Sequence, residues 1–187
     1  MRKVIVSNLV SLDGFIARPN GDLDWFVVND EFFNYSYDLL TKVDTILYGR
    51  VTYQGMASYW PTVTNPDDKT AERINNLPKV VFSKTLSSTP WGQWNNARLV
   101  KDNIGAEVTR LKQQSGKDMA IYGSGSIVSV LAQLGLIDEY QLVVCPVILG
   151  KGVSQFQTVE PSIKLNLLKS TPFKNGSVLS YYAPAAA

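Results

Sequence analysis

In Met119-Ala-Ile-Tyr-Gly-Ser-Gly-Ser-Ile-Val-Ser-Val-Leu-Ala-Gln-Leu134, an apolar strand is followed at once by a glycine turn and an apolar helix. The same succession comes earlier, where the strand Thr45–Tyr48 ends in Gly49-Arg50 before the helical stretch Val51–Ser58. At such a junction unpaired N–H groups and the positive end of the helix dipole face outward, and glycine lets a phosphate approach the backbone. Tight strand-to-helix turns also need glycine for purely structural reasons, so one such turn is weak evidence. Two turns side by side predict a dinucleotide-binding edge.

The rest of the chain continues this pattern of strands and helices. Strands are expected at Val4–Val10, Lys79–Phe82, Ala97–Val100, Glu139–Leu149, Ile163–Ser170 and Ser177–Tyr182. Helices are expected at Asp67–Asn75, at Ile104–Gln114 and from an N-cap at Asn29 or Asp30, the last with a buried side of Phe32, Phe33, Leu39, Leu40 and Val43. Alternating elements followed by strands alone predict one α/β domain over residues 1–187, with a mostly parallel central sheet and antiparallel C-terminal strands.

Composition excludes several kinds of chemistry. The 187 residues include no histidine and one cysteine, Cys145, so neither a Ser-His-Asp triad nor a His- or Cys-ligated metal site is available, and we expect no bound metal. A net charge of +2 without a Lys/Arg stripe does not favour nucleic acid. No stretch is apolar enough for a membrane span or a secretory leader, so we expect a cytoplasmic protein. An enzyme of this composition needs a cofactor for the difficult step.

Two further segments carry functional expectations. The long irregular loop Ser11–Asp22 is a candidate substrate-gating segment. Ser83 and Lys84 follow the strand Lys79–Phe82 at its carboxyl end, where open α/β sheets bind ligands. There they are suited to a ribose 2′-phosphate, which favours NADPH over NADH, although an ordinary solvated turn is an equally good interpretation.

Five motifs, taken in order, resemble the dihydrofolate-reductase-like superfamily. They are Ser11-Leu-Asp-Gly-Phe-Ile-Ala17, Leu47-Tyr-Gly-Arg-Val-Thr-Tyr-Gln54, Val80-Val-Phe-Ser-Lys-Thr85, Ile121-Tyr-Gly-Ser-Gly-Ser-Ile127 and Gly135-Leu-Ile-Asp-Glu-Tyr-Gln-Leu142. Together with Pro146-Val-Ile-Leu-Gly-Lys-Gly152, they are most similar to the reductase domain of bacterial riboflavin biosynthesis, the RibD C-terminal domain. The resemblance spans roughly Val4 to Phe156.

The resemblance implies a three-layer fold and NADPH-dependent hydride transfer to a pyrimidine- or pteridine-type metabolite, as in 5-amino-6-(5-phosphoribosylamino)uracil reductase. Its implied phosphate contacts are Gly49, Arg50 and Thr52, then Ser83 and Lys84 at the 2′-phosphate, and Gly123, Ser124, Gly125, Ser126 and Ile127 at the pyrophosphate. Its implied nicotinamide contacts are Val10, Ile16 and Ala17.

The substrate end is less well defined by the sequence. Dihydrofolate reductases carry a carboxylate on the first helix, but the comparable position here falls near Phe33, so no catalytic residue is assigned. A family turn that can adopt a cis peptide corresponds to Gly123-Ser124, where a cis bond would cost roughly 3 kcal/mol. Candidate substrate contacts, each with an alternative structural interpretation, are Asp13, Trp25, Glu31, Tyr53 and Pro146.

Two other functions remain open beside the leading one. The first is dihydrofolate reduction, and the second is a non-catalytic, regulatory NADPH-binding module, which is consistent with the missing acid. The apolar strand Leu142–Leu149 is expected at a sheet edge, and the related riboflavin reductase domains pair, so we also expect a homodimer.

Overall fold

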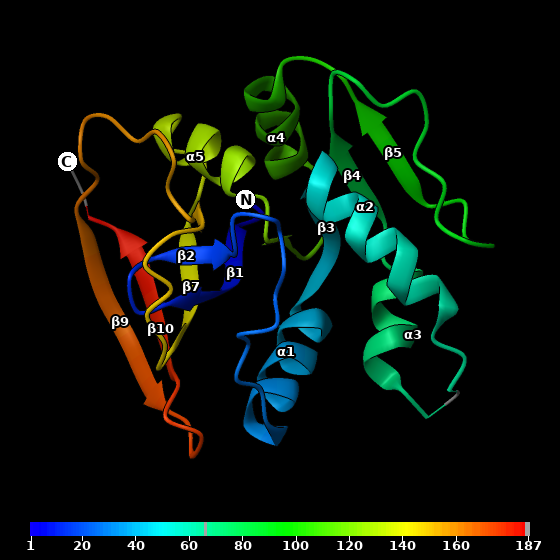
Figure 1. Cartoon of the computed structure of the whole chain (residues 1–187). Helices are drawn as coiled ribbons and strands as arrows, with labels where there is room; N and C mark the ends of the chain where they lie inside the picture. Colours follow the sequence, from blue (N-terminus) through cyan, green and yellow to red (C-terminus); the bar gives the residue numbers. More distant parts are fainter. Residues whose placement is uncertain (66, 186–187) are drawn as a thin grey trace.

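An eight-stranded sheet forms the centre of the molecule in a computed structural model that describes residues 1–65 and 67–185 (Figure 1). From edge to edge its strands are β5 (Ala97–Val100), β4 (Lys79–Phe82), β3 (Val43–Gly49), β6 (Asp118–Tyr122), β1 (Val4–Ser11), β7 (Glu139–Cys145), β10 (Val178–Pro184) and β9 (Leu165–Pro172). Strands β5 to β7 in this order are parallel, whereas β10 is antiparallel to both of its neighbours. The predicted mostly parallel sheet with antiparallel C-terminal strands is confirmed.

Helices cover both faces of the sheet and complete three layers. One face carries α1 (Asp30–Lys42), α2 (Arg50–Tyr59), the short 3-10 helix η1 (Trp60–Thr62) and α3 (Lys69–Asn76), and the other carries α4 (Ile104–Gln113) and α5 (Gly125–Gln133). Successive side chains of a strand point to opposite faces, so in β1 Val4 and Val6 join the core under α4 and α5, and Ile5 joins the core under α1. Among the residues described, no helix is both long and apolar enough to cross a bilayer.

Helix α1 confirms its predicted cap but corrects its predicted buried side. The side chain of Asn29 accepts a hydrogen bond from the Phe32 amide at 3.1 Å, and Leu39 and Leu40 are buried. The prediction that Phe33 is buried was wrong, because its side chain is 52% exposed. Neighbouring residues lie about 100° apart around a helix, so only Phe32 of this pair reaches the sheet.

The strand expected over Glu139–Leu149 is shorter than predicted and does not lie at an edge. Strand β7 ends at Cys145, because Pro146 has no N–H for the ladder and the Val147 amide turns back to the Cys145 carbonyl at 2.8 Å. It lies between β1 and β10, and the edge is formed by β9 instead. The expectation of an edge at Leu142–Leu149 was therefore wrong.

The long loop after the first strand contains more structure than expected. Strand β1 continues to Ser11, and Phe15–Ala17 form β2, which pairs with β8 (Val153–Ser154) in a small second sheet. This pairing brings the segment that follows β7 across the end of β1. The predicted gating loop is thus attached to a distant part of the chain.

Strand register brings the three predicted phosphate-binding segments to one edge of the main sheet. Leu47 of β3 pairs with Ile121 of β6, and Gly49 pairs with Phe82 of β4. These strands are parallel, so the turns that begin at Gly49, Ser83 and Gly123 all leave the sheet at its carboxyl edge.

Candidate functional site

The two glycine turns interlock through their own side chains and amides. The Gly49 amide donates to Oγ of Ser124 at 2.8 Å, and the Ser124 amide donates to Oγ1 of Thr52 at 2.9 Å. Each turn therefore fixes the other, and the N-termini of α2 and α5 are held next to each other. The sequence predicted two glycine turns side by side, and in the structure these turns are in direct contact.

Packing explains why glycine is required at these turns. A Cβ atom at Gly125 would lie 2.7 Å from the Ser154 carbonyl oxygen, which belongs to the backbone and cannot easily move. Gly123 has a φ of +60°, and a Cβ there would lie 2.8 Å from Oγ1 of Thr52. Ser124, with a φ of +57°, is a serine in the same left-handed region. The Gly123–Ser124 peptide bond is trans.

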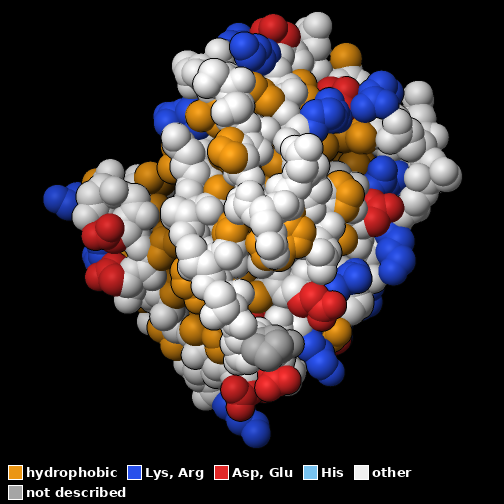
Figure 2. All heavy atoms as spheres, turned by 90° about the vertical axis from the view of Figure 1, so that its right-hand side faces the viewer, with side chains coloured by type: hydrophobic (Ala, Val, Ile, Leu, Met, Phe, Trp, Pro, Cys, Tyr) orange, Lys and Arg blue, Asp and Glu red, His pale blue; other side chains and the backbone are white. Residues whose placement is uncertain are grey.

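Free hydrogen-bond donors face outward from this pair of helices. The first amides of α2 and α5 have no partner within their own helices, and the positive ends of both dipoles point to the same edge. Arg50 is exposed at the start of α2, where its Nη1 donates to Oε1 of Gln54 at 3.1 Å. In Figure 2, Lys and Arg side chains lie at the upper end of the molecule, toward which β4 and β5 point in Figure 1, with Asp and Glu side chains among them. The two helix N-termini and the Arg50 guanidinium, rather than the overall surface charge, make this edge suitable for an anion.

Ser83 and Lys84 follow β4 at the same edge, but their side chains differ in freedom. Oγ of Ser83 accepts the amides of Thr85 at 3.2 Å and Leu86 at 3.1 Å, so this hydroxyl already closes the turn. The side chain of Lys84 is exposed. Of the two, Lys84 is the residue with a charge available for a 2′-phosphate.

The predicted nicotinamide contacts lie beside the N-terminus of α5. Val10 is buried at the end of β1, and Ile16 and Ala17 are half-buried in β2. The Cδ1 atom of Ile16 would lie 3.3 Å from a Cβ at Gly125, so β2 and the second glycine turn are in contact. The structure therefore brings these three residues to the edge that carries both glycine turns.

Asp13 connects the β1–β2 loop to the segment after β7. Its carboxylate accepts hydrogen bonds from Oγ of Ser11 at 2.6 Å, from the Leu149 amide at 3.1 Å and from the Gly150 amide at 2.7 Å. The Ser11 hydrogen bond, aided by the two amides, holds the pKa of Asp13 below its ordinary value. The carboxylate is thus an ionised acceptor that ties two loops together.

Glu31 and Pro146 meet at a turn that the sequence did not associate with either. Oε2 of Glu31 accepts the Lys174 amide at 2.7 Å, and a Cβ at Gly176 would lie 3.4 Å from Cγ of Pro146. Both residues therefore flank the turn between β9 and β10. Glu31 is half-buried and Pro146 is exposed.

The other two candidate substrate contacts are buried aromatic residues. Tyr53 donates its hydroxyl to the Pro90 carbonyl at 2.5 Å and lies against Trp91, with ring centroids 6.2 Å apart. Trp25 is 6% exposed and packs edge-on against Phe26. These surroundings favour a structural role for both residues, and Tyr53 lies in the core under α2 rather than beside Asp13.

A row of hydroxyl groups crosses the sheet under α1. Strand register places Ser7 opposite Tyr122, and the hydroxyls of Ser7 and Tyr35 share a hydrogen bond of 2.7 Å. The buried hydroxyls of Tyr48 and Tyr122 have no hydrogen-bond partner among the described residues. Burial raises the pKa of Tyr35, Tyr48 and Tyr122, so all three stay protonated and neutral.

Sequence reasoning missed Asn8 and Gln155, which lie beneath the second glycine turn. Nδ2 of Asn8 donates to Oε1 of Gln155 at 2.6 Å, and Oδ1 of Asn8 accepts the Gly123 amide at 2.5 Å. One signal for Asn8 was present, because a polar residue stands between Val6 and Val10 on the apolar side of β1. Nothing in the sequence marks Gln155.

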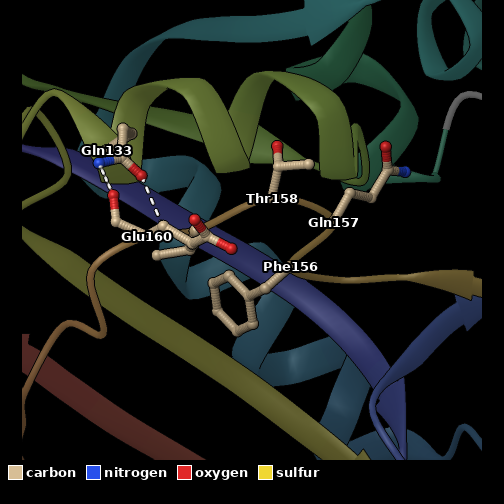
Figure 3. Close-up of a pocket in the computed structure, with 6 residues that line it drawn as sticks. Gln133, Phe156, Gln157, Thr158 and Glu160 are labelled. Carbon is tan, nitrogen blue, oxygen red and sulfur yellow. Dashed lines mark hydrogen bonds between the residues drawn. The ribbon is translucent and has the colours of Figure 1, made fainter.

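A separate hollow of about 580 Å³ lies at the other end of α5 (Figure 3). It is lined by Gln133, Phe156, Gln157, Thr158, Val159 and Glu160. Gln133 is the last residue of α5, so the negative end of the helix dipole faces this hollow. That polarity makes this hollow unsuitable for a phosphate group.

The carboxyl edge, in contrast, suits a dinucleotide phosphate. It presents two helix N-termini, an exposed guanidinium at Arg50 and an exposed ammonium at Lys84. Backbone amides and charged nitrogen donors are the groups that bind phosphate oxygens in proteins.

Comparison with known proteins identifies the family of this chain. The RibD C-terminal domain family matches residues 2–179. The chain belongs to this family. YyaP of Bacillus subtilis (strain 168), an uncharacterized protein, is 35% identical to this RibD C-terminal domain over 183 residues, which cover 97% of this chain and 94% of YyaP.

Solved structures show the same fold. A putative riboflavin biosynthesis protein from Shewanella sp. PV-4 superposes on this RibD C-terminal domain with a TM-score of 0.78 and 26% identity, covering 98% of this chain and 99% of that one. Dihydrofolate reductase from Enterococcus faecalis, in complex with NADP(H), superposes with a TM-score of 0.64 and 16% identity, covering 98% and 97%. The second likeness shows the fold alone.

Proposed function

We propose that this RibD C-terminal domain is an NADPH-dependent reductase that transfers hydride to a small metabolite with a pyrimidine- or pteridine-type ring, similar to the uracil reductase of riboflavin biosynthesis. One observation carries the proposal: the interlocked glycine turns at Gly49 and Gly123 hold two helix N-termini together at the carboxyl edge. Family membership and the dinucleotide-type edge both support an oxidoreductase. The cytoplasm is the proposed compartment.

The roles of the chain are to bind, to orient and to exclude water. Gly49, Arg50 and the amides of residues 125–127, at the start of α5, would hold the pyrophosphate region, and Lys84 would contact the 2′-phosphate. The amides of Gly123 and Ser124 are already bonded to Asn8 and Thr52 and would shape the turn. When bound, NADPH supplies the hydride. Val10 and the β2 residues Ile16 and Ala17 would flank the ring from which the hydride leaves, and their apolar surface keeps water away.

The substrate is proposed to bind beside β2, near Asp13 and the turn flanked by Glu31 and Pro146. Asp13 would shape this region indirectly, because its carboxylate fixes the loop at Gly150. The reduced ring also takes up a proton, and no residue is assigned as its donor.

The first experiment is a fluorescence titration of NADPH and NADH with the wild type, Arg50→Ala and Lys84→Ala. Loss of one charge-assisted contact to phosphate costs about 1.5–3 kcal/mol, which is roughly a 10- to 100-fold loss of affinity. We expect Arg50→Ala to weaken both dinucleotides and Lys84→Ala to weaken NADPH alone.

The matched control is Lys42→Ala, which removes an exposed cation immediately before β3, at the opposite edge of the sheet. Its NADPH affinity should equal that of the wild type. If the wild type binds neither dinucleotide, or if Lys42→Ala weakens NADPH as much as Lys84→Ala does, the proposed cofactor site is refuted.

Once binding is shown, NADPH oxidation should be followed with the ribosylaminouracil substrate and with dihydrofolate. Oxidation by the uracil compound supports the proposal, whereas turnover of dihydrofolate with tight methotrexate binding would identify a dihydrofolate reductase. Binding of NADPH without oxidation by any ring compound would identify a regulatory module.

We further propose a homodimer formed through strand β9. This strand ends the sheet, and its exposed apolar side chains include Leu165, Leu167 and Leu168. A second copy can add its own β9 across a two-fold axis and cover both the free backbone groups and the leucines. Light scattering should give twice the chain mass for the wild type and the single mass for Leu167→Lys. Leu134→Lys, at an exposed leucine after α5, is the control and should remain dimeric.

A further inference from the structure

The side-chain amide of Asn8 forms hydrogen bonds with both backbone polar groups of Gly123, in the second glycine turn. Its Oδ1 accepts the Gly123 amide at 2.5 Å, and its Nδ2 lies 3.2 Å from the Gly123 carbonyl oxygen, to which it donates. Both polar groups of Gly123 are thus held by one side chain. The next residue, Ser124, is the left-handed N-cap of α5, so the direction of this helix depends on the peptide that Asn8 holds.

Gln155 determines how the Asn8 amide is oriented. Its Oε1 accepts from Nδ2 of Asn8 at 2.6 Å, and its backbone N–H donates to the Gly14 carbonyl at 3.0 Å. Nδ2 of Asn8 must face this acceptor, which turns Oδ1 of Asn8 toward the Gly123 amide. Gln155 is 1% exposed, yet its Nε2 has no partner among the described residues. A buried amide donor without a partner is unfavourable for stability, which argues that this side chain serves another role.

The segment that carries Gln155 is attached along one face of α5. The Ser154 carbonyl lies against Gly125, the Gln157 amide donates to Oγ of Ser129 at 3.0 Å, and Gln133 and Glu160 exchange hydrogen bonds (Figure 3). Positions 125, 129 and 133 are spaced by four residues and so lie on one side of the helix. Residues 154–160 therefore form a strap along α5, and Gln155 is the strap residue that reaches the turn.

We propose that Asn8 and Gln155 are a positioning pair that sets the second glycine turn for the diphosphate of the dinucleotide. The inference rests on the proposed NADPH binding and deepens it. Asn8 acts on the turn, and Gln155 acts only through Asn8. Loss of either side chain leaves the helix in place, because the other strap contacts remain, but it releases the Gly123 peptide and with it the alignment of the amides at the start of α5.

The test compares two ligands across a double-mutant cycle of Asn8→Ala, Gln155→Met and the double variant. The ligands are NADPH, which contains the diphosphate, and adenosine 2′-monophosphate, which does not. We expect the dissociation constant for NADPH to rise roughly tenfold or more in Asn8→Ala, and the double variant to be no weaker than Asn8→Ala alone. The dissociation constant for adenosine 2′-monophosphate should change less than twofold.

Ser129→Ala is the matched control, because it removes a strap contact further along α5 and leaves the turn intact. It should bind NADPH as the wild type does, and far-UV circular dichroism should confirm that all variants fold. Equal weakening of both ligands, additive effects of the two substitutions, or a Ser129→Ala variant as weak as Gln155→Met would overturn the positioning role. If Asn8→Ala does not fold, Gln155→Met alone decides by the same ligand comparison.

Failure of this inference is distinguishable from failure of the proposed function. A wild type that does not bind NADPH overturns both. A wild type that binds NADPH, together with variants of unchanged affinity, overturns the positioning pair alone.

Discussion

Lys79 is a buried ammonium group with no carboxylate partner among the residues that the structure describes. Its side chain is 1% exposed, and Nζ donates to the Asn75 carbonyl at 2.6 Å, lies 3.3 Å from Oδ1 of Asn96 and stands 4.3 Å from the ring centroid of Trp91. Desolvation lowers the pKa of Lys79 from 10.5 to about 7. The folded state therefore holds this proton less tightly than the unfolded chain does.

The direction of the resulting pH dependence follows from this difference. Between pH 7 and pH 10.5 the unfolded chain binds more protons at this position than the folded protein, so the free energy of unfolding rises with pH. The destabilisation caused by the buried charge of Lys79 has its full size below pH 7 and disappears above pH 10.5. From pH 7 to pH 9 the gain in stability amounts to about 2 kcal/mol.

Urea denaturation at several pH values between 7 and 9 measures this gain, with Lys79→Met as the reference variant. Methionine fills a similar volume and does not titrate, so all other ionisable groups cancel in the difference between the two proteins. The stability of the wild type relative to Lys79→Met should rise by about 2 kcal/mol over this range. If the difference in unfolding free energy between the two proteins stays constant with pH, the lowered pKa of Lys79 is refuted. If the difference falls as the pH rises, the pKa of Lys79 is raised in the folded state instead of lowered.

Two further predictions concern the loops of the site. Gly125→Ala places a methyl group 2.7 Å from the Ser154 carbonyl oxygen and should lower the thermal unfolding midpoint. Gly55→Ala, where no atom of the described residues lies within 4 Å of the added Cβ, should raise the free energy of unfolding by about 0.5–1 kcal/mol. Equal midpoints for the two variants would contradict the packing argument. Asp13→Asn should speed amide hydrogen exchange at Gly150, because it removes the charged acceptor of that amide. In the wild type the pKa of Asp13 is lowered, so the Gly150 amide should stay protected at every pH above the ordinary pKa of an aspartate. The protection should be lost as the pH falls through the lowered pKa of Asp13. Unchanged exchange in Asp13→Asn would show that the carboxylate does not hold the loop.

Local sequence determined most of the secondary structure and the edge where the site lies. Gly49 and the Gly123 turn each follow an apolar strand and precede a helix, and parallel strands bring such junctions to one edge whatever the details of packing. The cap at Asn29 was also predictable, because the hydrogen bond from a helix's first free amides to an N-cap side chain involves only residues close in sequence. The exposure of Phe33 was not predictable, because the spacing of apolar residues allowed either Phe32 or Phe33 to face the sheet.

Only the tertiary structure decided how the site is held. Asn8 and Gln155 are 147 positions apart, and their hydrogen bond exists because β2 pairs with β8 and brings the strap back across β1. The interlock of Ser124 with Thr52, and the ties of Asp13 to Gly150 and of Glu31 to Lys174, likewise join distant segments. Sequence patterns report the periodic burial of apolar side chains, which is local. A hydrogen bond between two loops leaves no periodic pattern in the sequence, so the two residues that form it can be paired only from the folded structure.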